Sequence, residues 1–260
     1  MLRTVRATQY VTALREGGSL PAIVAADDSG MYVLKFRGAG QGPLALVAEL
    51  VAGEIGRRLG LRVPELVLME VDTAFGRNEP DHEIRDLIRR SAGLNLAMDY
   101  LPGSITFDPA AGDSASPEVA SLAVWFDAFV SNVDRTPRNA NLLRWHKELY
   151  FIDHGAALYW HHNWPDAERK ALSPFVEIKH HVLLPWASGL EAAEATAQQR
   201  LNTAVFTEIL ALVPDEWLIS DSGEVTAAER RTAYIEILSS RLAASSNFVQ
   251  EALGARVELV

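Results

Sequence analysis

The sequence has no cysteine among its 260 residues, and this absence excludes disulfide bonds, thiolate metal sites and a cysteine nucleophile. It also lacks a long apolar run, because the longest, residues 122–133, is interrupted by Asp127 and is too short to span a bilayer. Residues 1–6 contain no apolar core of the kind found in signal peptides. We therefore expect a cytoplasmic protein that does not associate with a membrane.

Lysine is scarce as well, because only four of the 24 basic residues are lysines and the rest are arginines. This preference, together with abundant alanine, is typical of a bacterial genome rich in G and C. The formal net charge of −10 disfavours non-specific binding to nucleic acid, so we expect no direct contact with it. A lysine inside an apolar segment, such as Lys35, therefore stands out.

The first hundred residues are typical of a β-rich lobe. Three strand-like segments separated by turn sequences predict an antiparallel meander at residues 10–14, 21–26 and 31–37. A helix is expected over residues 44–59, since Gly60 suits the left-handed position that ends a helix. The further elements predicted here are strands at 63–71 and 94–101 and a charged helical insert at 81–90.

After residue 102 the pattern changes to helices. Ser116 and Pro117 begin a helix, and an alanine-rich stretch predicts a helical segment over residues 191–213. We predict an α+β protein with a β-rich N-lobe, residues 1–101, and an α-helical C-lobe, residues 102–260, forming one domain around a shared cleft.

The strongest functional signal lies between residues 132 and 155. Asp134 and Asn139 have the D-x-x-x-x-N spacing of a kinase catalytic loop, and Asp153 ends a buried strand just before a glycine. Phosphoryl transfer from ATP needs such a set, because one Asp orients the acceptor hydroxyl while an Asn and a second Asp hold Mg²⁺ on the phosphates. The spacing therefore predicts ATP and Mg²⁺ as cofactors.

Two residues of the predicted N-lobe complete this set. Lys35 sits between apolar neighbours on a strand, where its ammonium could contact ATP phosphates. Glu49 is its expected partner, because small residues on the same side of the helix allow a close approach; Glu54 is the competing candidate.

Glycine-rich loops offer two candidates for contacts with phosphate. Gly17, Gly18 and Ser19 form a turn whose backbone N–H groups could approach the phosphates, although a simple hairpin turn has the same pattern. The rival loop at residues 38–42 lacks the complete dinucleotide fingerprint, so we expect the first turn to bind the nucleotide.

These motifs resemble the HipA-like branch of bacterial protein kinases, distantly related to lipid kinases of the phosphatidylinositol type, in a short form without the N-terminal domain. The resemblance covers about residues 10–160. It implies a bilobal kinase fold and phosphorylation of serine or threonine, with a protein as the acceptor. It assigns Lys35 to the ATP phosphates, Asp134 to catalysis, and Asn139 and Asp153 to the metal. It also makes Met98, Asp99 and Tyr100 a hinge whose backbone would bind adenine.

Two departures from the family pattern leave alternatives open. Thr136 replaces the usual His after Asp-Arg, and His154 replaces the Phe of Asp-Phe-Gly, so we expect the packing role of that aromatic ring to be absent. One alternative is a nucleotide-binding pseudokinase without turnover. A second is a metal-dependent hydrolase built on the histidines. The residues of that second site would be His154, His161, His162, His180 and His181 with Asp134 and Asp153.

Overall fold

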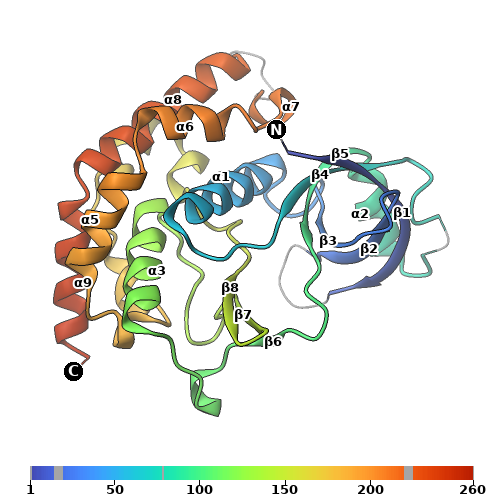
Figure 1. Cartoon of the computed structure of the whole chain (residues 1–260). Helices are drawn as coiled ribbons and strands as arrows, with labels where there is room; N and C mark the ends of the chain where they lie inside the picture. The colour runs from blue at the N-terminus through green and yellow to red at the C-terminus, as the bar shows by residue number, and fades with distance from the viewer. Residues whose placement is uncertain (1, 15–19, 78, 220–224, 260) are drawn as a thin grey trace.

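The computed structural model describes residues 2–14, 20–77, 79–219 and 225–259. It has a five-stranded barrel in the first hundred residues and a mainly helical remainder, with helix α1 between the two (Figure 1). The predicted α+β class is therefore confirmed. Among the helices of the described residues, none has both the length and the hydropathy needed to cross a membrane.

The barrel closes in the strand order β1-β2-β3-β5-β4. Neighbouring strands are antiparallel except β1 and β4, which run parallel. Alternate side chains point inward, so residues such as Val24, Leu34 and Met69 form a buried interior, and helix α2 packs Leu87 and Ile88 against it. The bounds are β1 (Thr4–Ala13), β2 (Ala22–Ala26), β3 (Met31–Lys35), β4 (Leu66–Val71), α2 (His82–Arg90) and β5 (Gly93–Asp99).

Helix α1 (Pro43–Leu59) is buried along most of its length because it packs on the barrel and on the C-terminal helices. Two glycines permit this close fit. A Cβ at Gly53 would lie 2.9 Å from Leu66 Cδ1, and one at Gly56 would lie 3.4 Å from Phe126. The helix ends at Gly60, whose φ of 92° suits glycine, as the sequence predicted.

The remainder of the chain surrounds helix α3 and a small sheet. The sheet has the order β6-β7-β8, and Figure 1 shows it beside α3, with α5 and α9 on the other side of that helix. The strands and α-helices are β6 (Ile105–Thr106), α3 (Pro117–Val130), β7 (Leu142–Trp145), β8 (Glu148–Phe151), α4 (Ala167–Ala171), α5 (Leu190–Arg200), α6 (Thr203–Leu210), α7 (Asp215–Leu218), α8 (Ala227–Ala243) and α9 (Ser246–Val257). The 3₁₀ helices are η1 (Pro109–Ala111), η2 (Tyr159–His162), η3 (Trp164–Asp166), η4 (Val176–His180) and η5 (Leu184–Trp186).

Most predicted elements are present, with three corrections. The meander is confirmed, but β1 begins at Thr4, six residues earlier than predicted. The single helix predicted over residues 191–213 is wrong, because the chain is extended at Leu201 and Asn202 caps a new helix by accepting a hydrogen bond from Val205 N–H. Strand β4 begins at Leu66, after Pro64, because proline lacks the N–H that a sheet ladder uses.

Two contacts attach the short helix α7 to the barrel. Trp217 Nε1 donates to the carbonyl oxygen of Leu94 on β5 at 3.2 Å, and Arg37 Nη1 lies 2.5 Å from Glu216 Oε2. Elements far apart in sequence are thus joined across α1.

The end of helix α3 is held by a buried arginine. The Arg241 guanidinium donates to the carbonyl oxygens of Phe129 at 2.6 Å and Ala128 at 2.5 Å, and also to that of Ala171. Carbonyl oxygens in the last turn of a helix have no N–H partner four residues further along the helix, so a cation at this end stabilises them. The chain therefore leaves α3 in a defined direction.

A buried histidine makes stability depend on pH. His161 is fully buried, and its Nδ1 lies 2.9 Å from the hydroxyl of Tyr234. Burial, with smaller effects from His162 and Arg230, lowers the pKa of His161 to about 3. In the unfolded chain its pKa is about 6.5. Below pH 6.5 the unfolded state binds a proton that the folded state does not. The contribution of His161 to the free energy of unfolding is therefore complete above pH 6.5 and decreases as the pH falls.

We therefore expect unfolding free energy to fall on acidification, and part of that fall to disappear in His161→Phe. Between pH 7.5 and 5.0 the fall should be smaller in the variant by about 2 kcal/mol. Urea unfolding at the two pH values measures this difference. His82→Phe is the control, because the His82 side chain is 76% exposed. An equal pH dependence in His161→Phe and the wild type would contradict the assignment.

Candidate active site

Lys35 is the centre of the site. It is the last residue of β3, and its side chain is only 10% exposed. Its Nζ donates to Glu49 Oε2 at 2.7 Å and to Asp153 Oδ1 at 2.5 Å. Burial alone would lower the pKa of Lys35, but the two carboxylates outweigh burial and raise it above its ordinary value. Lys35 is therefore a buried cation held between α1 and the segment after β8.

Glu49 is the residue of α1 that pairs with Lys35, as the sequence predicted. Its side chain is 1% exposed, and burial by itself would favour the neutral acid. The charge of Lys35, with the nearby His154, holds the pKa of the Glu49 carboxyl well below its usual range. The competing candidate, Glu54, instead lies 3.5 Å from Arg57 on the same helix.

Asp153 follows β8 in an unusual backbone conformation. Its φ is 56°, in the left-handed region that Asp tolerates better than most residues. Its carboxylate is 43% exposed, so one oxygen binds Lys35 while the group still reaches solvent. The Asp153 carboxylate is therefore both paired with Lys35 and partly open to solvent.

Asp134 and Asn139 lie together on the loop after α3. Asn139 Nδ2 donates to Asp134 Oδ2 at 2.8 Å, and the loop is closed by backbone hydrogen bonds of 3.0 Å in both directions between Thr136 and Asn139. Asn141 Nδ2 lies 3.5 Å from the same Asp134 oxygen, a weak contact. The structure thus brings the two predicted loop residues into direct contact.

A buried polar network that the sequence analysis did not identify supports this loop. Arg135 Nε lies 2.5 Å from Asp127 Oδ2, and Asn132 donates to the other Asp127 oxygen at 2.8 Å. His181 Nδ1 accepts a hydrogen bond from Leu183 N–H, so its Nε2–H donates to Asp127 at 2.9 Å. Burial favours a neutral Asp127, but the charge of Arg135 and the bond from His181 hold its pKa well below the ordinary range.

Arg135 also joins the loop that carries Asp134 to the segment between β8 and Asp153. Its Nη1 donates to the carbonyl oxygens of Asn141 at 2.5 Å and Ile152 at 3.3 Å, and Ile152 N–H donates to Asn141. Asp134 and Asp153 are therefore carried by segments bonded to one guanidinium. The only sequence signal was Asp127, a charge within an apolar helix.

The predicted hinge is the end of β5. Met98 is buried and pairs with Val33 of β3 and Leu66 of β4. The N–H group of Asp99 donates to the carbonyl oxygen of Glu65, and that of Tyr100 donates to Met31. Because both donors already have partners, neither is free to bind adenine in this arrangement.

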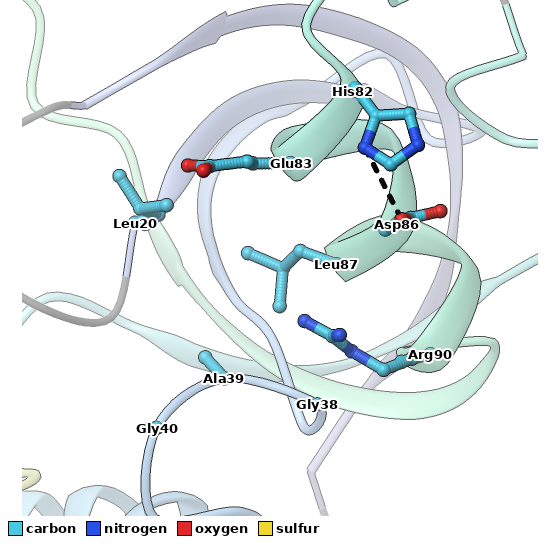
Figure 2. Close-up of a pocket in the computed structure, with 9 residues that line it drawn as sticks. All are labelled: Leu20, Gly38, Ala39, Gly40, His82, Glu83, Asp86, Leu87 and Arg90. Carbon is cyan, nitrogen blue, oxygen red and sulfur yellow. Dashed lines mark ion pairs between the residues drawn. The ribbon is translucent and has the colours of Figure 1, made fainter.

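The predicted phosphate-binding turn, Gly17, Gly18 and Ser19, lies outside the described residues. The rival glycine loop borders a cavity of about 310 Å³ beside α2, where Leu20 and Ala39 lie across from the helix (Figure 2). A second cavity, of about 440 Å³, lies near α3 and the β7–β8 hairpin. Neither cavity is lined by Lys35, Glu49 or Asp153, so both are separate from the candidate site.

The histidines do not gather at one site. His154 is fully buried beside Glu49, His161 bonds Tyr234, and His181 bonds Asp127. Within the described ranges no group of three or more His, Cys, Asp or Glu residues is arranged to hold a metal ion. The metal site of the alternative hydrolase is therefore not formed among the described residues.

The expected loss of aromatic packing at His154 is also wrong. Its ring lies 5.6 Å from that of Phe126, at an interplanar angle of 76°, an edge-to-face arrangement in the core. Histidine at this position therefore packs as an aromatic residue and adds two ring nitrogens.

One solved structure agrees with this description of the fold. A crystal structure of the proinflammatory kinase CtkA from Helicobacter pylori is similar, with a TM-score of 0.55 and 15% identity, and covers 100% of this chain and 99% of that chain. The Golgi casein kinase with Mn/ADP bound gives a TM-score of 0.49 and 9% identity, and covers 96% of this chain and 73% of that chain. A search among curated proteins found no match.

The sequence itself matches a family model. The model describes the HipA-like kinase family, and the match extends over residues 8–251, nearly the whole chain. The resemblance inferred from the motifs is thereby confirmed. The chain belongs to the HipA-like kinase family.

Proposed function

We propose that this protein transfers the γ-phosphate of ATP to a hydroxyl group, with a serine or threonine of a protein as the acceptor. The observation that carries the proposal is the bridge from Lys35 to Glu49 and Asp153. A strand lysine paired with a helix glutamate is the arrangement by which protein kinases hold ATP phosphates. Here the same lysine also contacts the carboxylate at the end of β8.

The charges around the site support a metal-dependent reaction. Glu49 and Asp153 supply two carboxylates, and Lys35 is the single cation bound to both. A triphosphate would be repelled by this excess of negative charge unless cations accompany it. The oxygen atoms of Asn139 and Asp153 are ligands that Mg²⁺ prefers, so the residues fit that ion. When bound, Mg²⁺ would neutralise charge on the β- and γ-phosphates.

Each residue then has a role that follows from its surroundings. Lys35 would contact the phosphates, held in place by Glu49. Asp134, oriented by Asn139, would accept the proton of the attacking hydroxyl, as a general base does. We propose that residues 1–101 and 102–260 form the two lobes of one catalytic domain and that ATP binds between them. The glycine turn and the hinge backbone stay predictions.

A protein acceptor is proposed from the family. The net charge of −10 disfavours docking on an anionic membrane surface, which makes a lipid the weaker choice. A pseudokinase is the second candidate, because Lys35 and Asp153 bind each other directly. Thr136, at the place where relatives carry His, fits either candidate. A cytoplasmic location stays a prediction.

The metal role of Asp153 can be tested with Asp153→Asn. This variant should weaken magnesium-dependent ATP binding and abolish phosphoryl transfer, because an amide oxygen carries no charge to hold the cation. Calorimetry with and without Mg²⁺, followed by a labelled-ATP transfer assay on cell extract, measures both. Asp166→Asn is the matched control, since the Asp166 side chain is 44% exposed, close to the 43% of Asp153. Normal magnesium-dependent binding and normal transfer by Asp153→Asn would exclude the metal role of Asp153, and no transfer by the wild type would exclude the kinase proposal.

The role of Asp134 separates nucleotide binding from chemistry. Asp134→Ala should retain the affinity for ATP. Its rate of phosphoryl transfer should fall by about 10²- to 10⁴-fold, which is the usual contribution of a general base. Asp134→Asn keeps an oxygen that can accept the bond from Asn139 but cannot take a proton, so it should be equally inactive. If either variant loses ATP binding, Asp134 is a ligand or a structural residue. A wild type that binds ATP with Mg²⁺ and transfers no phosphate would favour the pseudokinase.

A further inference from the structure

Two buried polar atoms face each other behind Lys35. Glu49 Oε1 and His154 Nδ1 lie 3.4 Å apart, and both side chains are almost completely buried. Neither atom has a hydrogen-bond partner among the described residues. A buried carboxylate oxygen without a hydrogen-bond donor is destabilising, and a proton on the facing ring nitrogen would reduce that cost. The separation exceeds that of a normal N–H···O bond by a few tenths of an ångström.

The packing of the His154 ring holds it in this position. Phe126 of α3 contacts it edge to face, with ring centroids 5.6 Å apart. On the α1 side, a Cβ at Gly53 would lie 4.0 Å from His154 Nδ1, so the glycine leaves room for the ring beside the helix. The ring is therefore placed between α1 and α3 with one nitrogen directed at Glu49.

These contacts connect Lys35, Glu49, His154 and Asp153 in a ring. Lys35 bonds Glu49 Oε2 and Asp153 Oδ1, Glu49 Oε1 faces His154, and His154 follows Asp153 in the chain. We propose that His154 is a positioning residue whose Nδ1–H donates to Glu49 and thereby couples helix α1 to the backbone of Asp153. A phenylalanine at this position would pack equally well but could not make that bond. The inference rests on the proposed function, because it assigns His154 to the orientation of the nucleotide-binding groups.

Two substitutions of His154 separate hydrogen bonding from packing. His154→Phe keeps the aromatic contact with Phe126 and removes the donor. His154→Asn keeps an N–H near the position of Nδ1 and removes the ring. A positioning role predicts that His154→Phe needs an about 10- to 100-fold higher magnesium concentration to bind a fluorescent ATP analogue than the wild type does. The increase should be smaller in His154→Asn. A packing role predicts the opposite order, which would overturn the proposal.

His161→Phe is the matched control at pH 8. It also removes a buried histidine and its hydrogen bonds, but those bonds are to Tyr234 and His162 and not to the site. It should leave the magnesium dependence unchanged even where it lowers the melting temperature. An equal shift in His161→Phe and His154→Phe would mean that general destabilisation causes the effect, and the proposal would be wrong.

Nuclear magnetic resonance of the wild type tests the bond without any catalytic activity. In protein labelled with ¹⁵N-histidine, the resonance lost in His154→Phe should show a proton on Nδ1, and Glu49→Gln should shift it. Absence of that proton, or an unchanged shift in Glu49→Gln, would overturn the proposal whatever the enzyme does. If the wild type shows no magnesium-dependent nucleotide binding, the proposed function fails, and the spectrum alone decides the His154–Glu49 bond.

Discussion

The ammonium of Lys35 needs anions because it is buried, and this requirement organises the site. An unpaired charge at 10% exposure would be strongly destabilising, and the protein supplies Glu49 from α1 and Asp153 from the segment after β8. Three segments widely separated in sequence are thereby held at one point. The position of α1 between the barrel and the C-terminal helices is part of the same constraint, since Glu49 reaches Lys35 only when the helix packs closely on the barrel (Figure 1).

Irregular backbone near the site is stabilised by guanidinium groups. Arg135 bonds carbonyl oxygens on both the loop that carries Asp134 and the segment between β8 and Asp153, and Arg241 bonds the last carbonyls of α3. Loops and helix ends leave carbonyl oxygens without partners, and a planar group with five donors can satisfy several of them at once. Of these two arginines, Arg135 has a buried carboxylate, Asp127, as a partner. Arg241 instead contacts carbonyl oxygens, and burial lowers the pKa of Arg241 to about 9.

The separation of roles within the site follows from exposure. Glu49 and His154 are buried and face other protein groups, so they are suited to orienting their neighbours. Asp153 is partly exposed and Asn139 is exposed, so they are suited to meeting a ligand. A kinase of the HipA-like family needs both kinds of residue, because phosphoryl transfer depends on groups that are held rigidly before the substrate arrives.

The sequence by itself determined the α+β class, most of the elements and the family, because strand and helix patterns and motif spacing are local properties. It favoured Glu49 over Glu54 as the partner of Lys35, and the packing of α1 on the barrel decided between the two. It failed at Leu201 and Asn202, where the chain is extended and a capping side chain begins a new helix within a stretch that alanine content favoured as one helix. Tertiary structure alone decided the bond between His181 and Asp127, the burial of His154 and the bonds that occupy the N–H groups of Asp99 and Tyr100. Each of these depends on residues tens of positions away, and no local pattern records which distant group will lie beside a buried polar atom.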